Sequence, residues 1–265
     1  MALDATYDTV LSRIRLAVTG ASGTATYMVV DRTTDGVRYT TVRGGAAAAV
    51  SGGIGSVDDY EFPAGVAITY RARAYTAADV LTNTYTDTIT QDLDAVWLKV
   101  PSAPFLNRPV TVSSAGDRTR AARRGIFDIA GRSNPVVVSD IRSSMSFDLR
   151  IRTEDADEEE TLDLILGTGE ILFFHLPVAN KCMPGGYYSA GDVTWGPPSS
   201  RAKPTRIFNI PLTGAAAPGP DVVGTTYTWA SAVAEYATWT DLIADNATWA
   251  DLLQRVGSPG DVVVP

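Results

Sequence analysis

The chain has 265 residues, of which 45% are hydrophobic and 20% charged, and its formal net charge is −8. This composition is typical of a soluble globular protein, and the length allows two domains with a tail. An acidic chain without an apolar run of about eighteen residues argues against duplex nucleic acid or a membrane as the main partner, and favours proteins or neutral glycans.

Cysteine and histidine each occur once, at Cys182 and His175. These counts exclude an intrachain disulfide and most zinc sites, so we expect no cofactor and no metal. The N-terminus lacks the basic and continuous apolar stretches of a secretory signal, so we expect synthesis in a cytoplasm without export.

Residues 1–95 predict an all-β domain. Short stretches of alternating polarity, rich in β-branched and aromatic residues, are separated by turn residues, and Asp35-Gly36 is a hairpin signal between two of them. The predicted strands are residues 13–18, 24–32, 37–42, 67–75 and 84–90. This pattern indicates a β-sandwich.

Residues 62–74 resemble the turn and strand of a fibronectin type III domain. Their sequence, FPAGVAITYRARA, places an apolar residue, a proline and a glycine before an alternating strand that ends in alanine. The chain departs from that family at Ile68, where a corner tyrosine is usual, and its early strands lack tryptophan. The resemblance implies a fibronectin III-like sandwich.

Within this domain, residues 43–56 are mostly glycine and alanine. We expect a flexible loop, or a segment that only a partner orders. A phosphate-binding loop is disfavoured because no Lys-Ser/Thr follows the glycines.

Residues 96–213 predict a β-rich domain with one helix. The predicted strands are residues 125–130, 134–141, 145–152, 170–177, 187–195 and 206–213. The helix spans residues 155–167: acidic residues crowd its first turn, Leu162, Ile165 and Leu166 form an inward stripe, and Gly167 supplies the stop.

The order of motifs in this domain is similar to that of the tube-type domain in minor and distal tail proteins of long-tailed bacteriophages. Gly131-Arg132 is followed by Pro135-Val136-Val137, Asp140 stands near Arg142, and the closing strand is followed by proline. The resemblance implies a β-sandwich or split barrel with one packed helix, assembled as a hexameric or trimeric ring with other tail proteins.

Charge is separated within the same domain. Seven arginines and three aspartates between positions 108 and 142 give a net charge of +4, whereas residues 154–170 carry −8. Two explanations stay open: head-to-tail contact between copies, or pairing within one chain. For the first, the segment 113–125 would be an arm that binds a neighbour through Arg118, Arg120, Arg123 and Arg124.

Two clusters could carry chemistry. Residues 153–160 have the carboxylate density of a calcium loop but lack its glycine and its final glutamate, so we interpret them as the solvated start of a helix. His175 could pair with Cys182, but no neighbouring group would activate the thiol, so we interpret it as a buried strand histidine. The chain is therefore predicted not to be an enzyme.

Residues 214–265 form a Pro/Gly/Ala linker followed by three decapeptides that begin Thr-Trp, with Trp229, Trp239 and Trp249. The spacing of Thr238 and Asp241 is that of a capping box, so we predict short capped helical turns with bends at Tyr236 and Asn246. Similar repeats occur at the ends of phage minor tail proteins. Each tryptophan could pack on its own domain, on another virion subunit, or on a sugar.

The sequence thus predicts a structural protein of a phage tail tip, located in the virion and acting by protein–protein assembly. The alternative is a carbohydrate-binding module that recognises host cell-wall glycan through its tryptophans.

Overall fold

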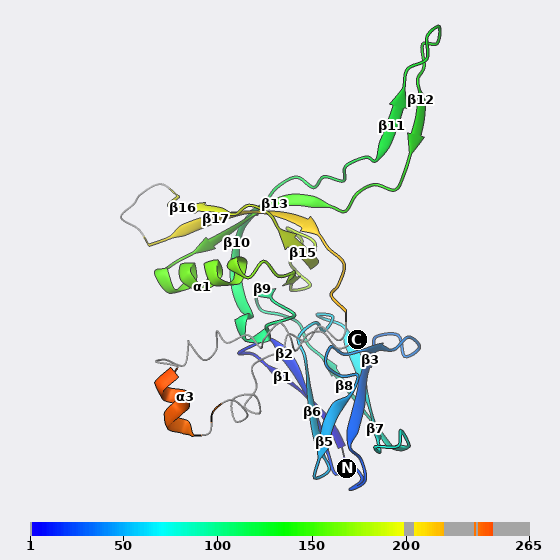
Figure 1. Cartoon of the computed structure of the whole chain (residues 1–265), viewed down its shortest axis with the longest axis vertical. Coiled ribbons are helices and arrows are strands. Elements are labelled where there is room, and N and C mark those ends of the chain that lie inside the picture. The colour runs from blue at the N-terminus through cyan, green and yellow to red at the C-terminus, as the bar shows by residue number, and fades with distance from the viewer. Residues whose placement is uncertain (1, 199–203, 220–235, 237, 246–265) are drawn as a thin grey trace.

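The computed structural model describes residues 2–198, 204–219, 236 and 238–245. The chain is mainly β, as the sequence predicts: two antiparallel β-domains lie end to end, and a two-stranded hairpin projects from the second (Figure 1). In the described residues, no helix has the length and apolar character needed to cross a membrane.

The first domain is a sandwich. Its strands are β1 (Ala2–Asp8), β2 (Arg13–Thr19), β3 (Tyr27–Thr33), β4 (Thr40–Thr41), β5 (Ala48–Ser51), β6 (Ile54–Asp59), β7 (Ala67–Tyr75) and β8 (Leu81–Thr90). One layer runs β1-β2-β6 and the other β4-β3-β7-β8, with β5 paired to both β6 and β3. These two layers agree with the β-sandwich that the sequence predicts.

Alternation along the strands builds the core of this sandwich. Ile14, Leu16 and Val18 of β2 point inward, as do alternate residues of β7, including Ile68 and Tyr70. Successive side chains of a strand point to opposite faces, so each strand covers the core with one face and meets solvent with the other.

The prediction of a flexible loop at residues 43–56 is wrong. These residues contain β5, the first half of β6 and the tight turn between the two strands, where Gly52 and Gly53 have φ of 60° and 77°. Glycine adopts positive φ without steric cost, so the pair suits a two-residue hairpin turn. Val50 and Val57 are buried on either side and anchor the hairpin without a partner.

The second domain is a closed barrel. Its strands are β9 (Val96–Lys99), β10 (Arg108–Ala115), β13 (Ser146–Thr153), β14 (Leu172–His175), β15 (Gly186–Ala190), β16 (Thr194–Gly196) and β17 (Arg206–Gly214). A short 3-10 helix (Pro104–Leu106) precedes β10. The order β13-β10-β9-β14-β15-β17 returns to β13 through a ladder from Ser146↔Thr213 to Thr153↔Arg206, which closes the sheet that the sequence left as a sandwich or split barrel.

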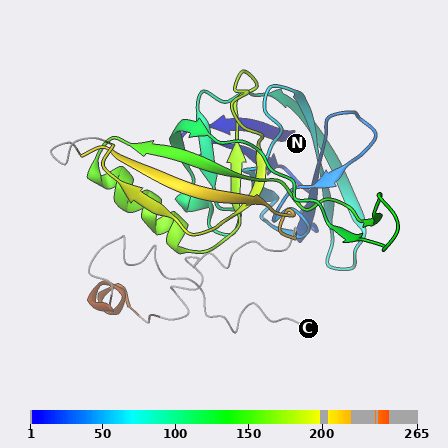
Figure 2. The same cartoon turned by 90° about the horizontal axis from the view of Figure 1, so that it is seen from above.

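Helix α1 (Ala156–Gly167) packs on this barrel (Figure 2). Asp155 caps it by accepting from the Glu158 N–H at 2.8 Å, and the Glu158 carboxylate accepts from the Glu154 N–H at 2.8 Å. Leu162 and Ile165 are buried against the sheet. The predicted acidic start of the helix is confirmed. The helix ends at Gly167, the predicted stop, but the glycine with positive φ at this end is Gly169.

The middle Thr-Trp repeat begins a short helix, α3 (Trp239–Asp245). The Thr238 hydroxyl accepts from the Asp241 N–H at 3.3 Å and donates to its carboxylate at 2.7 Å, which is the predicted capping interaction. Trp229 and Trp249, with the bend expected at Asn246, lie outside the described residues.

Candidate assembly interface

The hairpin that projects from the barrel is the candidate interface. We call residues 120–143 the arm; it contains β11 (Arg124–Phe127) and β12 (Val136–Ser139). The arm leaves the barrel between β10 and β13, beyond the bridge Thr119↔Ser146, and extends well away from the barrel (Figure 1).

Apolar side chains cover both faces of the arm. In the register of the hairpin, Ile126 lies opposite Val137, and Phe127 lies opposite Val136 on the other face. All four are exposed by 41% or more, as are Ile129, Val138 and Ile141. Among the described residues, neither edge of β11-β12 pairs with a third strand. An isolated two-stranded hairpin is at best marginally stable in water, and its open edges can pair with another chain, which makes the arm a candidate interface.

The sequence predicts strands here but not their exposure. A run such as Val136-Val137-Val138 normally indicates a buried strand, and all three of these valines are exposed. The signal that could have found the arm is the apolar run on both faces of a short hairpin that is flanked by arginines and serines.

The four predicted interface arginines lie on and beside the arm. Arg120, Arg123 and Arg124 are exposed on it, and Arg118 at its base donates to the Cys182 carbonyl at 3.3 Å. Within the described part of the chain, none of the four is in an ion pair with an acidic side chain. Their charges are therefore open to a neighbour.

The acidic helix lies on the other side of the molecule. α1 and the tip of the arm lie at opposite sides in both cartoon views (Figures 1 and 2). Two carboxylates of this region pair within the chain, Glu154 with Arg152 at 2.9 Å and Glu159 with Arg206 at 3.3 Å. Asp157, Glu160 and Asp163 remain on the exposed face, together with the 43% exposed Leu164.

Of the predicted tryptophan anchors, only Trp239 is described. It is 62% exposed at the start of α3, where Leu242 is buried and Ile243 exposed. Of the two neighbouring apolar residues in this repeat, Leu242 is therefore covered by protein and Ile243 faces solvent.

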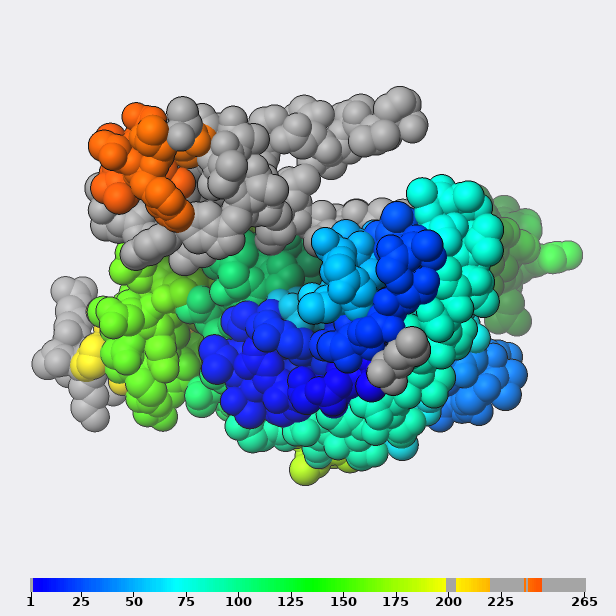
Figure 3. Space-filling model, turned by 90° about the horizontal axis from the view of Figure 1, so that it is seen from below, coloured from blue at the N-terminus to red at the C-terminus, as the bar shows by residue number. Residues whose placement is uncertain are grey.

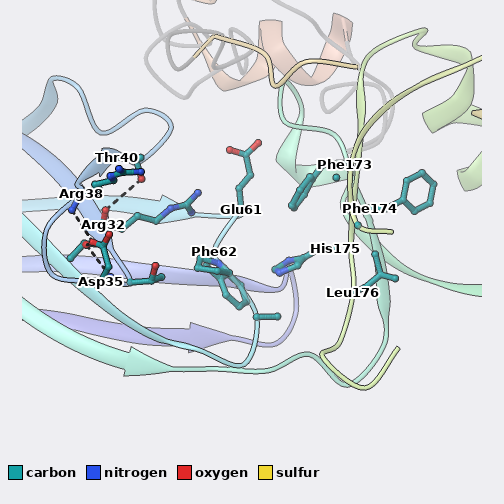
Figure 4. Close-up of a pocket in the computed structure, with 16 residues that line it drawn as sticks. Arg32, Asp35, Arg38, Thr40, Glu61, Phe62, Phe173, Phe174, His175 and Leu176 are labelled. Carbon is teal, nitrogen blue, oxygen red and sulfur yellow. Dashed lines mark hydrogen bonds between the residues drawn. The ribbon is translucent and has the colours of Figure 1, made fainter. Parts of the chain in front are cut away.

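A second feature is a cleft of about 660 Å³ that is lined by residues of both domains. Figure 3 shows the first domain, in blue to cyan, lying against the green surface of the second. Figure 4 shows Phe62 of the first domain facing His175 of the barrel, with their ring centroids 4.7 Å apart. Arg32 and Arg38 lie on one side of the cleft, and Phe173 on the other.

The cleft does not bring together the Cys–His pair considered from the sequence. His175 is buried and its Nδ1 lies 2.9 Å from the Lys99 amine, whereas Cys182 is exposed. Histidine on a buried strand is the interpretation that the structure supports. In the described residues, no group of three or more His, Cys, Asp or Glu side chains could hold a metal ion.

No protein-family model matches this chain, and no curated protein matches its sequence.

Proposed function

We propose that the chain is a structural subunit of a bacteriophage tail and that it assembles by inserting its arm against a second copy. The observation that carries this proposal is the arm itself, a hairpin with apolar side chains on both faces and two open edges. Exposed apolar area of this kind marks a surface that association covers.

A second copy is the partner that the charges favour. The arm is basic, α1 is acidic, and one molecule cannot bring them together because they lie on opposite sides. In a head-to-tail arrangement, the arm of each copy meets the acidic helix of the next, and such contacts form closed rings when the rotation closes. Leu164 on α1 offers an apolar contact beside the carboxylates.

The assignment to a phage tail rests on the ordered motifs between residues 123 and 218 and on the Thr-Trp repeats. A closed barrel with one packed helix agrees with the domain that this resemblance implies.

A charge-swap experiment tests the assembly. Arg123→Glu with Arg124→Glu reverses the arm, and Glu160→Arg with Asp163→Arg reverses the helix. Each pair alone should weaken self-association about tenfold or more, measured by sedimentation velocity, because like charges then face each other. The two pairs combined should restore association, and electron microscopy should then show rings of the combined variant.

The matched control is Arg15→Glu with Arg38→Glu, two exposed arginines of the first domain. This control should leave association unchanged. Association that survives reversal of the arm would contradict the assembly mechanism. Separately, an antibody against the chain should label the tails of purified phage particles, and its absence from tails would contradict the tail assignment.

A further inference from the structure

One buried lysine joins the two domains. Lys99 of β9 is 1% exposed, and its amine lies 2.5 Å from the Ser12 carbonyl, 2.8 Å from the Tyr60 carbonyl and 2.9 Å from Nδ1 of His175. Ser12 and Tyr60 belong to the first domain, whereas Lys99 and His175 belong to the barrel. The amine therefore has three partners, two of which lie across the junction.

The acidic groups near this amine are engaged elsewhere. Asp59 binds Arg32 and Tyr70, and Glu61 pairs with Arg43 at 3.1 Å. Within the described part of the chain, Lys99 is in no ion pair with a carboxylate.

The remaining surroundings offset only part of the cost of burying a charge on this amine. The aromatic rings of Phe62 and Trp97 lie 5.3 and 5.9 Å from Nζ, near the outer limit for attracting a cation, and the Asp59 and Glu61 carboxylates act on it without contact. The Tyr60 hydroxyl accepts from Arg13, and Arg32 adds positive charge near His175. An ammonium here would be buried without a carboxylate in contact, which is costly.

The tautomer of His175 distinguishes the two charge states of Lys99. An ammonium would donate to Nδ1, which places the imidazole proton on Nε2, and Nε2 is buried without a hydrogen-bond partner of good geometry among the described residues. A neutral amine would donate to the two carbonyls and accept from Nδ1–H. In that tautomer Nε2 carries no proton and is only an unused hydrogen-bond acceptor. Buried N–H groups without acceptors are rarer than unused acceptors, so the neutral amine fits the site better.

We propose that Lys99 is held as a neutral amine between the Ser12 and Tyr60 carbonyls and the Nδ1–H of His175, and that proton uptake by Lys99 loosens the docking of the two domains. The proposal is independent of the tail function. Burial lowers the pKa of Lys99 to about 7. Burial, with the positive charges of Lys99 and Arg32, lowers the pKa of His175 to about 2, so His175 stays neutral while Lys99 titrates.

The direction of the effect follows from proton linkage. The pKa of Lys99 is about 7 when the domains are docked and returns to its ordinary value of 10.5 when the amine meets water. At a pH between these two pKa values, Lys99 is protonated in the opened form and neutral in the docked form. Opening therefore takes up a proton and is favoured as the pH falls. The opening constant should rise about tenfold per pH unit on going from pH 10 towards pH 7, and level off below pH 7.

Two measurements on the full chain test the proposal. NMR titration of labelled lysine amines should give Lys99 a midpoint near neutrality. Hydrogen exchange, corrected for its intrinsic pH dependence, should show that peptides around Tyr60 and His175 lose protection between pH 9 and pH 7 relative to the domain cores.

Lys99→Met should abolish this pH dependence, whereas Lys181→Met, the matched control on the surface, should keep it. An ordinary midpoint for Lys99 would overturn the proposal, as would junction protection that does not change with pH or that changes equally in Lys99→Met. If Lys99→Met does not fold, the titration of wild-type Lys99 decides alone.

Discussion

At the residue scale, Asp59 is a carboxylate of the first domain that accepts several hydrogen bonds. Each of its two oxygens lies 2.6 Å from the Arg32 guanidinium, which donates to both. The carboxylate also accepts from the buried Tyr70 hydroxyl at 2.8 Å and from the Glu61 N–H at 2.9 Å. Burial and the Asp59 charge raise the pKa of Tyr70, so its hydroxyl stays a donor. Every group around Asp59 therefore donates, and only an acceptor fits between them.

Asp59→Asn should therefore lower the free energy of unfolding by about 3–5 kcal/mol, because an amide N–H would face these donors and Arg32 would lose its counter-ion. Urea denaturation followed by tyrosine fluorescence would measure the loss. The neighbouring Asp58 pairs with Arg13 and the exposed Arg15, so Asp58→Asn should cost only about 0–1 kcal/mol. Equal losses in the two variants would contradict the distinction.

At the element scale, the N-terminus of α1 depends on one cap. The Asp155 carboxylate satisfies the Glu158 N–H, which no carbonyl inside the helix can reach. Asp155→Ala should cost about 1 kcal/mol, measured as a loss of thermal stability. Asp157→Ala changes the helix dipole interaction in the same turn without removing the cap, and should cost no more than a few tenths of a kcal/mol. A larger loss for Asp157→Ala than for Asp155→Ala would show that charge rather than capping sets the stability of this end.

The sequence reveals those strands and helices whose apolar and polar residues follow a regular local pattern. β7 was predicted because its residues alternate between core and solvent, and α1 because its acidic start and apolar stripe are local features. β9 was missed because all four of its residues are buried, and one of them is a lysine. β11 and β12 were predicted as strands, but their apolar residues gave no sign in the sequence that they lie away from the chain's own core.

The same limit applies to the candidate sites. The arginines of the arm could be singled out because they are close together in sequence. The contact between Lys99 and His175 could not, because the pair is 76 residues apart and only the closed barrel places β9 beside β14. The sequence correctly indicated that His175 is a buried strand residue, but it could not supply the partner.

At the scale of the whole molecule, the two domains are joined by packing as well as by Lys99. Gly65 of the first domain has φ of 72°, and a Cβ there would lie 2.2 Å from Cγ2 of Val178 in the second domain. The Val178 N–H also donates to the Asp92 carboxylate at 3.1 Å. The two domains are therefore also in contact at a second point, where both Gly65 and Val178 are exposed, far from the lysine in sequence.

A double-mutant cycle tests this packing. Gly65→Ala should destabilise the protein by about 1–3 kcal/mol or more, because it adds backbone strain at positive φ and a steric clash across the junction. Val178→Ala removes the opposing methyl group, so the double variant should recover about 1 kcal/mol relative to the sum of the single changes, while the backbone strain remains. Chemical denaturation of the four proteins gives the coupling energy. If the two changes are strictly additive, the domains move apart at this point to accommodate the new methyl group, and the contact is not rigid. The junction would then depend mainly on Lys99 and its three partners.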